Sequence, residues 1–181
     1  MSEELLIRHC APTLAGMKTG SLFSYRPQQN EDLNAELRRL NRLLGRKGLR
    51  VMPLGVQRGR VLIYVYRPDR LRRDLNDSEA GAMLCNLGYS VCSTGKCVAA
   101  LMQRLRENGS FPHEIGLFLG YPPEDVAGFI AHRDCGCKCV GCWKVYGDAA
   151  AAEETFSRYK QCTSSYLRAF HSGRSLSQLA V

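Results

Sequence analysis

The sequence predicts one α/β or α+β domain over residues 1–181, with a mixed sheet that includes one β-hairpin, several helices and a long C-terminal helix. Segments with helical periodicity alternate with short segments rich in β-branched and aromatic residues, which is typical of layered α/β and α+β proteins. The length of 181 residues suits one domain, and a hydrophobic content of 45% is enough for a buried core. No internal repeat or long linker divides the chain.

The hairpin is the clearest element in the first half of the chain. Residues 60–67 are rich in β-branched and aromatic side chains, and a Gln-Arg-Gly turn separates them from a second expected strand at residues 49–56. Two helices are expected before the hairpin. One begins after Ser2, whose hydroxyl suits a helix cap, and the other follows Asn30 and ends at Gly45 or Gly48.

The second half of the chain is expected to be mainly helical, with two short strands. Five helices are expected: one after Pro68, one from Asp77 to about Gly88, one over residues 93–108, one that begins at Pro122 and one from Asp148 toward the C-terminus. The expected strands are residues 115–119 and 143–146. The cysteine-rich residues 135–142 are expected to form a loop. The aromatic stripe of the last helix is interpreted as a core-facing surface.

The first residues argue for a cytoplasmic protein. Met1 is followed by an acidic segment with only three consecutive large apolar residues, which is unlike a secretory signal. The longest apolar run elsewhere, residues 61–65, is far shorter than the ~20 residues that span a bilayer. We therefore expect no membrane association and reduced thiols.

The chain contains nine cysteines, an odd number that one chain cannot pair completely in disulfides. Four of them lie within eight residues, and thiolates are strong ligands for zinc, copper(I) and iron–sulfur clusters. The leading hypothesis is therefore a zinc or iron–sulfur site at Cys135, Cys137, Cys139 and Cys142.

Two alternatives to this metal site stay open. Cys139 and Cys142 form a C-x2-C pair that resembles a redox motif, although the expected strand after it is unlike the helix of thioredoxin-like proteins. The four thiols can also be ordinary cysteines that take part in no metal or redox site. Because one short loop must fold tightly to place four sulfurs around one ion, we also consider the more distant ligands His132, Cys162 and Cys97.

A basic region fills the first part of the chain. Residues 1–75 contain fifteen Lys or Arg against seven Asp or Glu, so all of the net charge of +8 lies there. Such a region favours anionic partners, either a nucleic acid or an acidic protein such as a flavodoxin, and is otherwise a solvated helix face. The candidate anion-binding residues are Arg38, Arg39, Arg42, Arg46 and Arg50.

A third possibility is an enzyme pocket around His113, Glu114 and Tyr121, in which a His–Glu pair performs acid–base chemistry. Position 117 is Leu, where a zinc-protease helix needs a second His. A turn histidine beside an exposed carboxylate is the alternative interpretation. The sequence leaves open whether the protein is an enzyme.

Several stretches together resemble a known family. They are Cys-Ala-Pro-Thr-Leu-Ala-Gly at residues 10–16, Phe-Pro-His-Glu-Ile-Gly at residues 111–116, Leu-Gly-Tyr-Pro at residues 119–122 and Trp-Lys-Val-Tyr-Gly-Asp at residues 143–148. The chain resembles the bacterial domain-of-unknown-function family 3793, small cytosolic proteins of anaerobic bacteria, from about residue 5 to residue 181. The resemblance implies a cytosolic protein of an anaerobe and favours iron or redox metabolism, in which a cluster or metal protein transfers electrons or handles iron.

Overall fold

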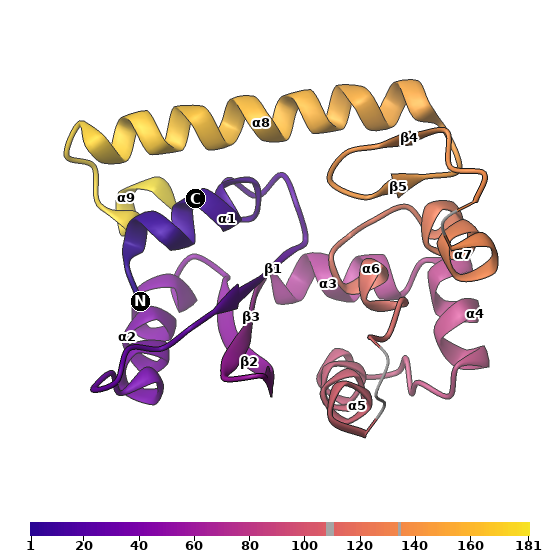
Figure 1. Ribbon diagram of the computed structural model, residues 1–181, viewed down its shortest axis with the longest axis horizontal. Coiled ribbons are helices and arrows are strands. Elements are labelled where there is room, and N and C mark those ends of the chain that lie inside the picture. The colour runs from indigo at the N-terminus through magenta and orange to yellow at the C-terminus, as the bar shows by residue number, and fades with distance from the viewer. Residues whose placement is uncertain (108–110, 134) are drawn as a thin grey trace. The chain divides into compact units, whose positions relative to one another are not determined.

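The computed structural model describes residues 1–107, 111–133 and 135–181, and Figure 1 shows the order of their helices and strands. These residues divide into two compact units, which we call the first unit (Met1–Arg70 with Gln161–Val181) and the second unit (Leu71–Lys160). The predicted fold class, the hairpin and the long C-terminal helix are confirmed. The single domain over residues 1–181 stays a prediction.

The first unit combines a three-stranded sheet with helices from both ends of the chain. The strands pair in the order β1-β3-β2, and both pairings are antiparallel. The elements are α1 (Glu3–Leu14), β1 (Gly20–Tyr25), α2 (Leu33–Gly45), β2 (Arg50–Gln57), β3 (Arg60–Tyr66) and α9 (Leu176–Leu179). The predicted hairpin is β2–β3, whereas β1 was not predicted from the sequence.

Both long helices of the first unit begin at side-chain caps. Ser2 Oγ accepts the Leu5 N–H, as predicted. Asp32 Oδ1 accepts the Ala35 N–H, so the cap of α2 lies two residues after the predicted Asn30. The Asn41 amide donates to and accepts from the backbone of Val51, which ties α2 to the edge strand β2. The apolar faces of α1 and α2 meet the sheet in one core.

Arg67, directly after β3, organises the end of α1. Its guanidinium donates to four main-chain oxygens, those of Thr13 (2.7 Å), Leu14 (2.7 Å), Lys47 (3.2 Å) and Val181 (2.6 Å). The last carbonyls of a helix have no partner within the helix, so one cation satisfies several of them at once. Burial lowers the pKa of this guanidinium, as does the nearby charge of Arg70.

The second unit is mainly helical. Its elements are α3 (Pro68–Leu75, which begins in the first unit), α4 (Ser78–Asn86), α5 (Thr94–Glu107), α6 (Ile115–Phe118), α7 (Pro123–His132), β4 (Cys139–Val140) and β5 (Lys144–Val145). The predicted helices correspond to α3, α4, α5 and α7, and the last predicted residue of α5, Asn108, lies outside the described residues.

Two sequence predictions for the second unit are wrong. Residues 115–119 were expected to form a strand, yet they contain the helical turn α6, in which the Leu119 N–H donates to the Ile115 carbonyl. All five residues are buried, and a short apolar run buried on every side has no periodicity that distinguishes a strand from a helix. The cysteine-rich loop likewise contains a strand, β4, because Cys139 and Val140 pair with β5.

The long helix α8 (Ala149–His171) begins in the second unit and ends in the first (Figure 1). Its aromatic stripe is half buried rather than fully buried: Tyr166 and Phe170 pack against the core of the first unit. Neither α8 nor any other helix in the described part of the chain has the length and hydrophobicity required to cross a membrane.

We expect Arg67→Met to lower the free energy of unfolding by about 2–4 kcal/mol, because four carbonyls lose a charged donor while the aliphatic stem is retained. Urea denaturation followed by circular dichroism measures this change. Arg46→Met, at the exposed end of α2, is the matched control and should change stability by less than about 0.5 kcal/mol. Equal stabilities of the two variants would contradict the role of Arg67.

Candidate functional site

The cysteine-rich segment contains a short hairpin. Cys139 lies opposite Val145 and Val140 lies opposite Lys144 in the antiparallel pair β4–β5. The Gly141 N–H donates to the Trp143 carbonyl at 3.0 Å, which closes the turn that contains Cys142. The two cysteines of the C-x2-C pair therefore lie on the same hairpin, one in strand β4 and one in the turn.

Asp125, in the first turn of α7, holds this hairpin in place. Its side chain is 3% exposed. The carboxylate accepts hydrogen bonds from Trp143 Nε1 at 2.6 Å, from the Tyr146 backbone N–H at 2.7 Å and from the Gly147 backbone N–H at 2.8 Å. Hydrogen bonds to an ionised acceptor are stronger than neutral ones, so this residue fixes both the indole ring and the chain after β5.

Aromatic rings and glycines pack the hairpin against its neighbours. The Trp143 ring stacks on Tyr121 with a centroid distance of 4.8 Å and meets Phe156 edge to face at 4.6 Å. A Cβ atom at Gly141 would lie 2.2 Å from the Phe156 ring, so the turn approaches α8 as closely as it does only because residue 141 is glycine.

The four clustered thiols differ in exposure. Cys135 and Cys142 are exposed, whereas Cys137 and Cys139 are half buried. Burial raises the pKa of the Cys139 thiol, and the negative charges of Glu153, Asp125 and Cys137 raise it further. This environment is opposite to the one that activates redox thiols, which have a lowered pKa. None of the nine cysteines forms a disulfide in the described structure.

The more distant predicted ligands lie in different surroundings. His132 is the exposed last residue of α7, and its ring centroid is 6.3 Å from that of Tyr146. Cys97 is buried in α5 and donates to the Ser90 carbonyl at 3.3 Å, while Cys162 packs against the core of the first unit. Within residues 1–107, 111–133 and 135–181, no three His, Cys, Asp or Glu side chains form a group arranged to hold a metal ion.

Glu114, a member of the predicted enzyme pocket, is buried in a polar network that was not predicted from the sequence. Its Oε1 accepts a hydrogen bond from Tyr89 at 2.9 Å and forms an ion pair with Arg104 at 3.4 Å. Burial raises the pKa of the Tyr89 hydroxyl, and the Glu114 carboxylate raises it further. The network joins the chain before α5, α5 itself and the chain before α6, which indicates a structural role for Glu114.

The two other residues of that predicted pocket have separate contacts. The His113 ring meets the Phe129 ring edge to face at 4.9 Å. Tyr121 donates its hydroxyl to the Cys142 carbonyl at 3.1 Å, so it supports the cysteine hairpin. Burial raises the pKa of Tyr121 to about 12, and the hydroxyl is therefore a donor at neutral pH. Tyr121 thus belongs to the surroundings of the thiols.

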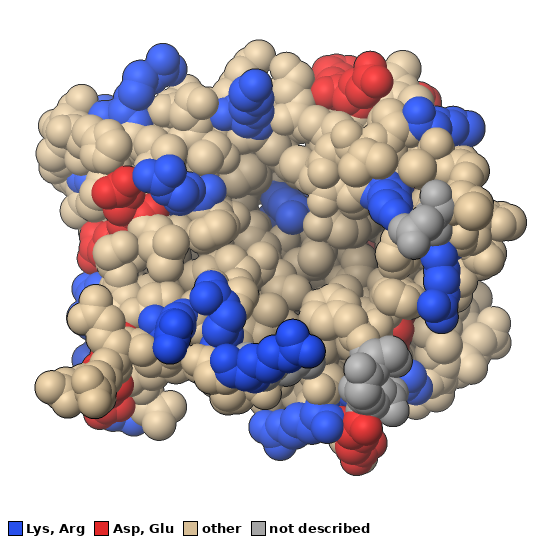
Figure 2. Space-filling model, viewed as in Figure 1, with Lys and Arg blue, Asp and Glu red and all other residues tan. Residues whose placement is uncertain are grey.

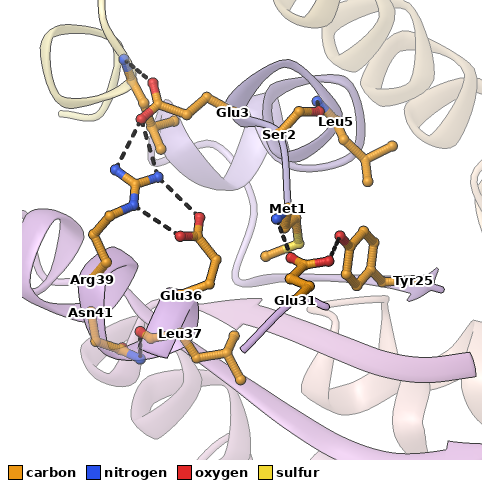
Figure 3. A network of polar contacts seen from close by, with 11 residues as sticks. Met1, Ser2, Glu3, Leu5, Tyr25, Glu31, Glu36, Leu37, Arg39 and Asn41 are labelled. Carbon is orange, nitrogen blue, oxygen red and sulfur yellow. Dashed lines mark hydrogen bonds and ion pairs between the residues drawn. The ribbon is translucent and has the colours of Figure 1, made fainter. Parts of the chain in front are cut away.

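The predicted anion-binding arginines are partly neutralised. Figure 3 shows the Arg39 guanidinium between Glu36 and Glu3, to which it pairs at 3.0 and 3.2 Å. Arg38 lies 3.9 Å from Asp32. A hollow of about 540 Å³ lies beside this network, and the carboxylates that line it are equal in number to its positive groups, which are two guanidinium groups and the Met1 amine. Its lining residues are Met1, Ser2, Tyr25, Gln28, Glu31, Asp32, Ala35, Glu36, Arg39 and Arg42.

The positive charge is unequally divided between the two units. The first unit contains fifteen Lys or Arg and six Asp or Glu, a net charge of +9, whereas the second contains ten and eleven, a net charge of −1. On the face shown in Figure 2, the basic side chains stand in separate groups and not in one continuous patch. The structure therefore supports a general attraction of anions to the first unit more than one focused anion site.

Comparison with known proteins identifies the family. The model of the family described as "Protein of unknown function (DUF3793)" matches residues 6–180. The chain belongs to this family. The match covers both units of this DUF3793 protein, including α7 and the cysteine hairpin. No curated protein and no solved structure matched the chain. The family description assigns no function, so the chemistry of the site must be argued from its own residues.

We expect Asp125→Asn to loosen the hairpin, because the amide has one acceptor oxygen for three donors and places its own N–H₂ group against an N–H. The expected loss is about 2–3 kcal/mol of unfolding free energy. Trp143 is the only tryptophan, so its fluorescence should shift to longer wavelength and report this change directly.

Asp148→Asn is the matched control for that substitution. Asp148 is exposed and accepts the Ala151 N–H at the start of α8, a position where Asn caps a helix about as well as Asp. Its tryptophan emission and stability should stay close to those of the unchanged protein. An Asp125→Asn variant with the emission of the control would show that the carboxylate does not hold the hairpin.

Proposed function

We propose that this protein binds a thiophilic metal, zinc or iron, through the cysteines of the hairpin, with Cys139 and Cys142 as the essential pair. One observation carries the proposal: the C-x2-C pair spans a tight hairpin turn that Asp125 and Trp143 hold in place. C-x2-C is a typical ligand spacing of structural zinc sites. Cys135 and Cys137 precede the pair and supply two further thiols to the same segment.

The chemistry of the segment supports a metal more than a disulfide exchange reaction. The raised pKa of the Cys139 thiol makes it a slow nucleophile at neutral pH. A strand follows the C-x2-C pair, so no helix N-terminus stabilises a thiolate there. With iron bound as a cluster, the role of the protein would be electron transfer or iron handling together with a protein partner.

The proposal predicts that Cys139→Ser with Cys142→Ser abolishes retention of zinc and iron, because serine oxygens are poor ligands for thiophilic ions. The measurement is elemental analysis of untagged protein purified without oxygen, before and after reloading with Zn²⁺ or with iron and sulfide. Cobalt(II) adds a spectroscopic readout, since thiolate coordination gives intense absorption that oxygen ligands do not.

Cys85→Ser with Cys92→Ser is the matched control, because it also removes two exposed thiols of the second unit. This control should keep full metal occupancy. Equal occupancy in both double variants would place the metal elsewhere, and unchanged protein that takes up neither metal would refute the proposal.

A second candidate function is the binding of an anionic partner, such as an acidic protein or a nucleic acid, by the first unit. Its net charge of +9 favours this function. Ion pairs engage Arg38 and Arg39, so the partner would meet mainly Arg42, Arg46 and Arg50. Contacts of this kind give an affinity that decreases steeply with salt.

The second candidate predicts that the protein retards a short DNA duplex at low salt, and that changing Arg42, Arg46 and Arg50 to Ala reduces the salt slope of the binding constant by about 3. Fluorescence anisotropy across a salt series measures both quantities. The control changes Arg106, Arg158 and Lys160, three exposed cations of the second unit, and should leave the slope unchanged. Unchanged protein that fails to bind the duplex at low salt would exclude nucleic acid as the partner.

A further inference from the structure

We infer that Cys92 and Cys97 form a reversible disulfide when a hydroperoxide oxidises the protein. Both residues lie in the second unit, one before α5 and one in its first turn, in a different segment from the cysteine hairpin. Both sulfurs contact the same residue. Cys92 Sγ lies 3.1 Å from Ser90 Oγ, and Cys97 Sγ donates to the Ser90 carbonyl at 3.3 Å. Ser90 therefore gathers two thiols around one turn of the chain.

Backbone hydrogen bonds fold the chain between the two cysteines back on itself. The Ser93 N–H donates to the Ser90 carbonyl at 3.5 Å, and the Cys97 N–H donates to the Ser93 carbonyl at 3.0 Å. Ser93 directly follows Cys92, so one hydrogen bond connects Cys97 to the neighbour of its proposed partner. The two sulfurs meet when their side chains turn away from Ser90 and toward each other.

The two thiols differ in their access to solvent. Cys92 is exposed, whereas Cys97 is fully buried. Burial raises the pKa of the Cys97 thiol, and the negative charges of Cys92 and Cys85 raise it further. A dissolved oxidant therefore reacts first with Cys92. Cys97 completes the disulfide because its sulfur is held beside the oxidised one, and such proximity offsets a low intrinsic reactivity.

The reaction is a two-electron oxidation in two steps. The Cys92 sulfur attacks one oxygen of the hydroperoxide and the O–O bond breaks. The leaving oxygen takes the thiol proton and departs as water or as an alcohol, so that Cys92 becomes a sulfenic acid. The Cys97 sulfur then attacks the Cys92 sulfur, the S–S bond forms as the S–O bond breaks, and hydroxide leaves with the Cys97 proton as water.

A dithiol reverses the oxidation by thiol–disulfide exchange and is itself converted to a disulfide. The reduced and oxidised forms differ at the Ser90 carbonyl, which accepts the Cys97 thiol proton only in the reduced form. Ser90 follows Tyr89, whose hydroxyl donates to the buried Glu114 at 2.9 Å. The disulfide thus forms directly beside the polar network of the second unit.

Cys85 provides the matched control for Cys92. It is also exposed, it lies in α4, and its charge also acts on the Cys97 thiol. The contacts with Ser90 belong to Cys92 and Cys97. Geometry therefore selects Cys92 as the partner, although both exposed thiols lie within electrostatic reach of Cys97.

Peptide mapping of the whole chain tests the inference. Reduced protein is treated with hydrogen peroxide, the remaining thiols are blocked with iodoacetamide, and the protein is digested with trypsin. Lys96 separates the two cysteines, so we expect mass spectrometry to find the peptide of residues 74–96 joined to that of residues 97–104. Dithiothreitol should separate them.

Two single substitutions identify the partner of Cys97, because the peptide of residues 74–96 contains both Cys85 and Cys92. Cys92→Ser should lower the yield of the joined peptides at least about tenfold, whereas Cys85→Ser should leave it unchanged. The reverse result would make Cys85 the partner and overturn the inference. Unchanged protein that gives no joined peptides would overturn it as well.

Cys97→Ser tests the order of the two steps, since serine keeps a donor for the Ser90 carbonyl but cannot close the disulfide. In this variant the sulfenic acid should persist at Cys92 and react with dimedone, which adds a fixed mass to that residue. Dimedone found on Cys85 and not on Cys92 would contradict the assignment of the first step. None of these measurements depends on a metal at the cysteine hairpin.

Discussion

The hairpin depends on one buried carboxylate. Asp125 accepts hydrogen bonds from an indole N–H and from two backbone N–H groups. A carboxylate removed from water is stable only when such donors surround it. The chain from Trp143 to Gly147 must therefore bend around Asp125 at the start of α7. The preceding turn follows from this bend, so the positions of Cys139 and Cys142 derive from a residue that lies in another element.

In the first unit a cation, the Arg67 guanidinium, connects distant segments through hydrogen bonds to the main chain. Arg67 donates to main-chain oxygens at the end of α1, near the end of α2 and at residue 181. In both units a partly or fully buried ion is balanced by backbone dipoles, an anion by N–H groups and a cation by C=O groups. This arrangement joins segments that are far apart in sequence.

The sequence predicted those elements whose signals are local. The hairpin of residues 50–66 and the capped helices could be predicted because side-chain alternation, a turn glycine and capping hydroxyls act over a few residues. Residues 115–119 were assigned wrongly because burial on every side removes periodicity. The cysteines of the site were visible from their spacing, whereas Asp125 was not, since a buried acceptor is recognised only once its distant donors are known. The same holds for Arg104 and Tyr89 around Glu114.

The bond from the Tyr121 hydroxyl to the Cys142 carbonyl has a thermodynamic consequence. The backbone of the turn is anchored through its oxygen, and the sulfur takes no part in that bond. The conformational entropy of the turn is therefore lost when the chain folds, before any ligand arrives. A group that later reacts with or coordinates this sulfur meets a chain that is already ordered, and more of its intrinsic binding energy is then expressed as affinity.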